Sequence, residues 1–295
     1  MTVRHNIDTC SMLVEFNASV WTARKLDRST SEEVVNSKNA AAKDAARVNK
    51  HLLAGRNELE EINSFVSTIR RFVEDNTLPW SDSGIRLLPT KKFLDFNDHM
   101  GALEEKFTTM VAEFVSIYPS LITAQAMALG DMFKRDEYPS ANEIEHKFGF
   151  RLHYMPVPTA GDFRIDVGNE AQDELRAQLE KIAQERIDNA MSHARGKLKG
   201  HLDRLMKQLR TEGGGKTKDG KAKMPSIYDS LIDGGIELCD ALESLNLVND
   251  PTIEGARMEL KALLNQFDIK DLRKLPEART EMRTQVAEIM DKFAF

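Results

Sequence analysis

The chain has little cysteine and no long apolar run. Its two cysteines, Cys10 and Cys239, lie far apart in a sequence of 295 residues. That spacing fits neither a disulfide framework nor a CxxC metal site. No run approaches the ~20 apolar residues that a membrane-spanning helix needs. The first ten residues also lack the apolar core and small-residue cleavage site of a signal peptide. We therefore expect a cytoplasmic protein that does not bind membranes.

Sequence motifs of catalysis and metal binding are missing as well. The segment Gly213–Thr217 resembles a phosphate-binding loop, but the motif needs a glycine where Arg210 stands, with a strand before it and a helix after it. The seven histidines include no HExxH pair, and no GxSxG motif occurs. We expect a non-enzymatic protein with no catalytic residue, metal or cofactor. A hydrolase stays open only because carboxylates are abundant.

Helical periodicity dominates the rest of the sequence, which is 41% hydrophobic and 30% charged. We predict a mainly α fold with a small β component (α+β) that is not an OB-fold. The expected helices cover one or two stretches within 31–74, capped by Ser31, then 90–133 with a break at Pro119, a short helix after Ser140, 170–209, and three more after 225, 251 and 275. The expected β structure is a strand at 11–17, an extended link at 85–89 and a hairpin near 150–167.

The helical pattern divides the chain into four consecutive segments without an internal repeat. These are an N-terminal helical region with a short strand (1–137), a short helix with the hairpin (138–168), a long helix with a basic loop (169–223), and C-terminal helices (224–295). We expect one intertwined unit. The apolar stripes are longer than one small core can cover, so we also expect a homodimer.

The segment 195–223 concentrates positive charge on an acidic protein. It holds ten basic and three acidic residues, a net charge of +7; because the whole chain carries −6, the remainder carries −13. Such a field attracts an anionic partner. The alternative interpretation is that these charges have no binding role: the helix face is simply exposed to solvent, and the loop after it is a flexible linker. The candidate nucleic-acid-binding cations are Arg195, Lys197, Lys199, Arg204, Lys207, Arg210, Lys216, Lys218, Lys221 and Lys223.

Two aromatic residues near cations are candidates for stacking on bases. Trp80 lies in a Pro- and Gly-containing turn before Arg86, and Tyr154 lies close to Arg151. Single-stranded nucleic acid is bound by this mixture, because cations follow phosphates while rings stack on bases. Trp21 is better interpreted as a core anchor.

Several short segments resemble a family of uncharacterised bacteriophage proteins, best over residues 20–167. The segments are Trp21–Asp27, Asn49–Gly55, Thr77–Trp80, Arg86–Pro89 and Gly161–Ile165. The family is similar to a mostly helical, single-stranded-DNA-binding cofactor of RNA polymerase. The resemblance implies binding of single-stranded DNA at melted phage promoters, recruitment of the phage RNA polymerase, a role in transcription regulation, and the host cytoplasm as location. It assigns no binding residue.

The sequence therefore favours a single-stranded-DNA-binding protein of low sequence specificity. The rival hypothesis is a helical scaffold or adaptor that acts through protein–protein contacts, with the basic loop as a linker or as a dock for an acidic partner.

Overall fold

The computed structural model describes residues 7–42, 44–158, 169–213 and 224–295. It is 67% helical with 12% strand, which confirms the predicted mainly α fold with a small β component. The chain forms two compact units. Unit 1 comprises Met1–Glu15, Phe72–Phe96 and His153–Phe295, and unit 2 comprises Phe16–Arg71 and Asn97–Leu152. Both units are assembled from segments far apart in the sequence, whereas the sequence analysis divided the chain into consecutive segments.

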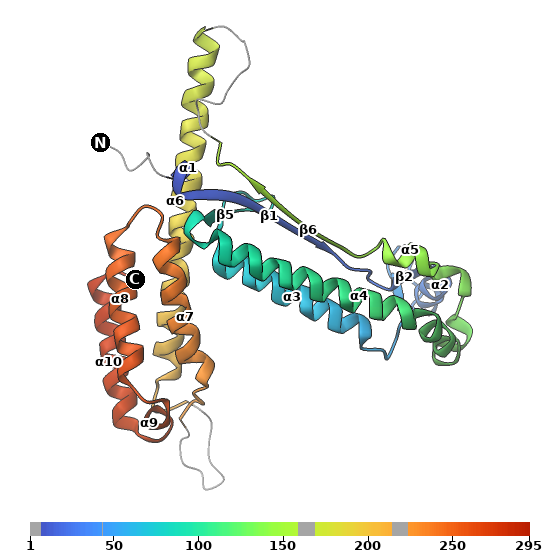
Figure 1. The fold of residues 1–295 in the computed structure, drawn as a ribbon. Helices are drawn as coiled ribbons and strands as arrows, with labels where there is room; N and C mark the ends of the chain where they lie inside the picture. Colours follow the sequence, from blue (N-terminus) through green and yellow to red (C-terminus); the bar gives the residue numbers. More distant parts are fainter. Residues whose placement is uncertain (1–6, 43, 159–168, 214–223) are drawn as a thin grey trace. The chain divides into compact units, whose positions relative to one another are not determined.

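The elements follow one another from α1 to α10 (Figure 1). The helices are α1 (Ile7–Cys10), α2 (Arg28–Ser37), α3 (Glu58–Asn76), α4 (Phe93–Leu129), α5 (Ala141–Glu145), α6 (Asn169–Gln208), α7 (Asp229–Leu245), α8 (Pro251–Gln266), α9 (Ile269–Lys274) and α10 (Pro276–Lys292). The strands are β1 (Ser11–Ser19), β2 (Arg24–Asp27), β3 (Val48–His51), β4 (Leu78–Pro79), β5 (Ile85–Pro89) and β6 (Gly149–Met155).

The described strands form a four-stranded antiparallel sheet, in the order β4-β5-β1-β6, and a two-stranded ribbon of β2 and β3. In the sheet, Leu13 of β1 lies opposite Leu87 of β5, and both side chains are buried. The extended link predicted at 85–89 is thus a paired strand. The described strands do not form the five-stranded barrel of an OB-fold.

Strand β6 confirms the first strand of the predicted hairpin near 150–167. It lies beside the N-terminal strand β1 in the sheet. The return strand of that hairpin falls at residues outside the described part of the chain.

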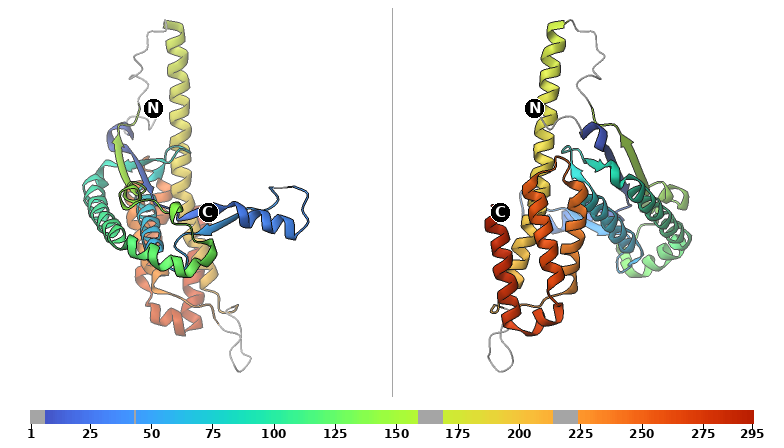
Figure 2. Two further views of the ribbon diagram at one scale, coloured as in Figure 1. Left: turned by 90° about the vertical axis from the view of Figure 1, so that its right-hand side faces the viewer. Right: turned by 60° about the vertical axis from the view of Figure 1, so that its left-hand side comes forward.

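In unit 1, helices α7, α8 and α10 pack against the C-terminal half of α6 (Figures 1 and 2). Leucines at steps of three and four residues, along α6 and in the turn directly after it, form the centre of this bundle and have no exposed surface: Leu198, Leu202, Leu205 and Leu209. The later helices begin where side chains cap them: Asp250 accepts a hydrogen bond from the Thr252 amide, and Asp268 accepts one from the Lys270 amide. The periodicity that predicted α6 is therefore the periodicity of its buried face.

In unit 2, α3 and α4 share one apolar core with the residues around the ribbon. Trp21 packs edge-to-face on Tyr118 of α4 at 5.7 Å between ring centroids. The Tyr138 hydroxyl donates to the Leu52 carbonyl at 2.8 Å, which satisfies a polar group within this core. Trp21 is 9% exposed, which confirms it as a core anchor.

The predicted helical stretch 31–74 is wrong over its middle part. Residues 48–51 form strand β3, and only α2 and α3 on either side are helical. The expected cap Ser31 lies inside α2. The N-cap of α2 is Asp27, whose carboxylate accepts a hydrogen bond from the Thr30 amide at 3.1 Å. Four residues are too few to show the two-residue periodicity of a strand. The helix-like spacing on either side therefore hides this strand in the sequence.

The predicted break at Pro119 is also wrong, because α4 runs through it. Pro119 is exposed, so its ring lies on the solvent side of α4 and does not interrupt the packing of the buried face. Two further boundaries differ. Helix α7 begins at Asp229 rather than near 225, and the short helix α9 was not predicted.

Helix α4 with its flanking turns, Thr90–Met132, is long and apolar enough to cross a membrane by length and composition, which the sequence analysis did not expect. It is the one such helix among the described residues. Within unit 2 it supplies buried core residues, including Phe107, Phe114 and Tyr118.

Candidate nucleic-acid interface

The C-terminal half of α6 separates apolar from basic side chains. While its leucines point into the bundle, five of the ten predicted cations are exposed to solvent: Arg195, and four that come after it in the chain. We call these four the basic strip: Lys199, Arg204, Lys207 and Arg210.

The basic strip is held by few internal contacts. Lys199 forms an i,i+4 ion pair with Asp203 at 3.6 Å, with about half of each side chain exposed. The Arg204 Nε donates to the Gly200 carbonyl at 3.2 Å. The side chains of Lys207 and Arg210 have no polar partner among the described residues. Because an exposed pair such as Lys199–Asp203 contributes only about 0–1 kcal/mol, a phosphate can replace it at little cost.

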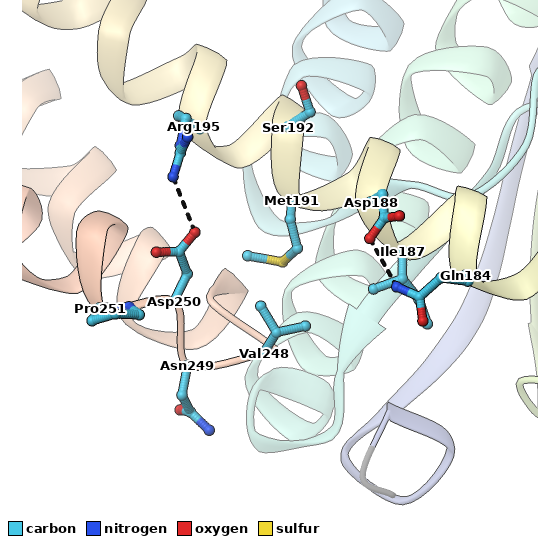
Figure 3. A pocket seen from close by; sticks show the side chains of 10 residues that line it. All are labelled: Gln184, Ile187, Asp188, Met191, Ser192, Arg195, Val248, Asn249, Asp250 and Pro251. Atoms are coloured by element: carbon cyan, nitrogen blue, oxygen red, sulfur yellow. Dashed lines mark hydrogen bonds and ion pairs between the residues drawn. The ribbon is translucent and has the colours of Figure 1, made fainter. Parts of the chain in front are cut away.

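Arg195 lies one helical turn before Lys199 on α6, at the edge of a cleft in unit 1. Its guanidinium contacts Asp250 at 3.3 Å, and Asp250 also caps α8 (Figure 3). The cleft has a volume of about 610 Å³ between α6 and the α7–α8 loop. Met191 and Val248 contribute apolar surface to it (Figure 3). The Arg195 side chain is 46% exposed, so its pair with Asp250 is partly solvated and Arg195 stays in the candidate DNA-binding set.

Lys197 is an internal residue, contrary to the prediction. Its ammonium contacts Asp75 at 3.5 Å and donates to the Glu74 carbonyl at 2.5 Å, at the C-terminal end of α3. Burial lowers the pKa of Lys197, while the neighbouring Asp75 raises it. A cation at this position satisfies a terminal carbonyl and complements the negative end of the helix dipole.

The four predicted loop lysines, Lys216, Lys218, Lys221 and Lys223, lie outside the described residues. The described residues on either side of them are brought together by Arg279 of α10, which is 2% exposed. Its guanidinium donates to the Arg210 carbonyl at 3.2 Å and to the Pro225 carbonyl at 2.9 Å. It also donates to the Gln208 and Leu272 carbonyls. One buried side chain thus fixes the end of the basic strip next to the start of the following segment.

Neither predicted stacking residue is free to stack. Trp80 is 4% exposed and belongs to the core of unit 1, where the Arg186 guanidinium lies 5.5 Å from its ring centroid. Its prediction as a surface residue is wrong. Tyr154 is half-buried and packs edge-to-face on Phe93 at 5.1 Å, and burial raises the pKa of its hydroxyl.

The structure offers Tyr228 instead, which the sequence analysis missed. Its side chain is 67% exposed, and it is the one large exposed aromatic among the described residues. Arg273 brackets it, donating to the carbonyl of Ile227 at 2.9 Å and to Asp229 at 2.8 Å. Tyr228 follows Pro225 closely, so it lies at the same end of the bundle as Arg210. Its place just after the basic loop was the available signal in the sequence.

Comparisons with known proteins add no relative: no family model, curated protein or solved structure matches the chain. Within the described ranges, no group of three or more His, Cys, Asp or Glu side chains is placed to hold a metal ion.

Proposed function

We propose that this protein binds single-stranded DNA without catalysing a reaction and with low sequence specificity. The observation that carries the proposal is the exposed basic strip, which continues directly into a segment with four more lysines. A flexible single strand can follow such cations with its phosphates, and these contacts read little base identity.

Tyr228 supplies the second component of single-strand binding. An exposed ring beside cations offers a face on which a base can stack, and each such contact contributes about 1–3 kcal/mol. Duplex DNA presents no free base face, so Tyr228 is the residue that would favour the single strand.

The finer role rests on the family resemblance. We propose that the protein acts in the cytoplasm as a transcription cofactor that binds melted phage promoter DNA and recruits the phage RNA polymerase, as a homodimer. Retention of the polymerase by the immobilised protein, and sedimentation equilibrium for the dimer, test these two parts separately.

The scaffold hypothesis is favoured by a different observation. Helix α4 exposes large apolar side chains, with Met127 at 90% and Leu94 at 72%. Each side chain offers a protein partner one apolar contact, although the two lie far apart along α4 and form no contiguous patch. A scaffold would show these contacts without binding DNA.

The decisive experiment is fluorescence anisotropy with a labelled single strand and its matching duplex across a salt series. If about six phosphates are engaged, the log–log salt slope for the single strand is roughly −4. Replacing all four loop lysines by alanine should move the slope to roughly −1.5, because four phosphate contacts are lost. Tyr228→Ala should weaken binding of the single strand about fivefold or more.

Lys181→Ala is the matched control. Lys181 lies on the N-terminal part of α6, is 79% exposed and pairs only with Glu185 among the described residues. Its removal should leave affinity and slope unchanged. No binding of either DNA at low salt would overturn the proposal and leave the scaffold, whereas binding with an unchanged slope would remove the loop lysines from it.

A further inference from the structure

The two-stranded ribbon of unit 2 has two unlike faces. In its antiparallel register Arg24 lies opposite His51, and Leu26 lies opposite Asn49. Because side chains alternate along a strand, these four residues share one face, and Lys25, Asp27, Val48 and Lys50 share the other. We call the first set the open face: Arg24, Leu26, Asn49 and His51.

The second face is anchored in unit 2. Lys50 is 3% exposed; its ammonium contacts Glu137 at 2.6 Å, the Met132 carbonyl at 2.9 Å and Asp27 at 3.7 Å. Both carboxylates help to satisfy a charge that would otherwise be buried alone.

The ends of the ribbon are fixed as well. The Ser31 hydroxyl accepts from the Val48 amide at 2.9 Å, and the Leu52 amide donates to the Ala23 carbonyl at 2.7 Å. The ribbon is therefore held by ion pairs on one face and by hydrogen bonds at both ends, which preorganises the other face.

The open face is exposed along its whole length, with Leu26 at 41%. Two further arginines adjoin the ribbon in sequence: Arg28 is the first residue of α2, directly after β2, and Arg47 comes directly before β3. Among the described residues the side chains of Arg24, Arg28 and Arg47 have no hydrogen-bond or ion-pair partner. In the left view of Figure 2 the ribbon and α2 extend away from α3 and α4 of the same unit.

From these observations we infer that the open face docks into the major groove of duplex DNA. A four-residue strand is about 13 Å long, and the major groove is about 12 Å wide and accepts a two-stranded ribbon. An arginine such as Arg24 can form two hydrogen bonds with the edge of a guanine, and an asparagine such as Asn49 can form two with an adenine. Leu26 provides an apolar contact for the methyl group of a thymine. Arg28 and Arg47 flank them as phosphate contacts.

The chemistry of the open face favours a duplex over a single strand, because its one aromatic ring is the small imidazole of His51, whereas single-strand sites stack bases on larger rings. It favours DNA over double-stranded RNA, since the A-form major groove is too deep and narrow for side chains to read.

The inference is independent of the proposed function, because it concerns another unit and another form of DNA. It is tested in the variant in which the four loop lysines are alanine, which removes four of the proposed single-strand contacts and leaves those of the basic strip and Tyr228. The probe is a pool of labelled 20-base-pair DNA duplexes of random sequence, measured by anisotropy at low salt. The same variant is measured with a random RNA duplex.

Arg24→Ala and Asn49→Ala should each weaken binding of the DNA duplex by about fivefold or more. Lys25→Ala is the matched control, because it removes the same charge from the same strand but on the opposite face; less than a twofold change is expected. The RNA duplex should bind at least about tenfold more weakly than DNA.

Three results overturn the inference. One is unchanged affinity for the DNA duplex in both Arg24→Ala and Asn49→Ala. Another is an equal loss of affinity for the DNA duplex in Lys25→Ala and Arg24→Ala, which would show that the ribbon acts only through its net positive charge. The third is equal affinity for the RNA and DNA duplexes, or no binding of either duplex. Failure of single-strand binding alone leaves the ribbon inference standing.

Discussion

His201 is a polar residue in the core of the unit 1 bundle. It lies on α6, is 3% exposed, and its Nε2 has no hydrogen-bond partner among the described residues. Burial, and next the positive charge of Arg204, lower the pKa of its imidazole to about 4. The ring is therefore neutral in the folded protein at pH 7, and its protonation is linked to unfolding.

The stability of the protein should fall as the pH drops below about 6.5. The folded pKa is lower than the value of 6.5 for an unperturbed histidine, so the unfolded chain binds the proton first. The contribution of His201 is fully present above pH 6.5 and is lost as the pH falls from 6.5 to 4. Between pH 7 and pH 5 we expect a loss of about 2 kcal/mol in the free energy of unfolding from this residue.

Urea denaturation of wild type and His201→Gln at both pH values measures this term. The variant should lose about 2 kcal/mol less than wild type between pH 7 and 5. His146→Gln, at an exposed position, should keep the wild-type difference. Equal pH dependence in wild type and His201→Gln would show that His201 does not titrate as inferred.

Individual side-chain positions were the least predictable part of the site. Pro79 and Gly84 correctly predicted a turn. The presence of a turn, however, does not determine whether the Trp80 side chain points to solvent or into the core. Trp80 is buried because the short strand β4 packs against α6. Lys197 follows the same logic: its neighbours Glu74 and Asp75 are more than a hundred residues away in sequence. Local pattern carries no information about such distant partners.

At the scale of elements, long periodic helices were predictable and short strands were not. The leucine spacing of α6 repeats over many turns, so the burial of one face could be derived from it. Strand β3 offers only four residues, and Val48 and Leu52 continue the spacing of a helix. Its identity comes from pairing with β2, a long-range interaction that decides short segments.

Two neighbouring glycines of α7 test how closely α6, α7 and α8 pack. A Cβ added at Gly235 would lie 2.4 Å from His201 Nε2 and 2.7 Å from Leu264 Cδ1. Gly235→Ala should therefore destabilise the protein by about 1–3 kcal/mol through overpacking. A Cβ added at Gly234 meets nothing within 4 Å. Gly234→Ala should stabilise the helix by up to about 1 kcal/mol.

Urea denaturation of the two variants gives the comparison directly, since both make the same chemical change one residue apart. A loss of stability in Gly234→Ala as large as that in Gly235→Ala would mean that the close approach of His201 is not what excludes a side chain.

At the scale of the molecule, each unit carries one tryptophan in its core. Trp21 is buried in unit 2 and Trp80 in unit 1. Replacing either by phenylalanine leaves a single fluorescent reporter for the other unit. The chain also runs repeatedly from one unit to the other, because α3, α4, β1 and β6 each begin in one unit and end in the other.

We expect the two units to unfold as one cooperative transition. When the part of α3 in unit 1 unfolds, the part of α3 in unit 2 is destabilised as well. Destabilising one unit should therefore lower the unfolding midpoint reported by both tryptophans. With Gly235→Ala added to Trp21→Phe and to Trp80→Phe, the urea midpoint should fall by the same amount in both backgrounds. Gly234→Ala added to the same backgrounds should lower neither midpoint. If the midpoint reported by Trp80 falls while that reported by Trp21 stays, the units unfold independently despite the helices and strands that they share.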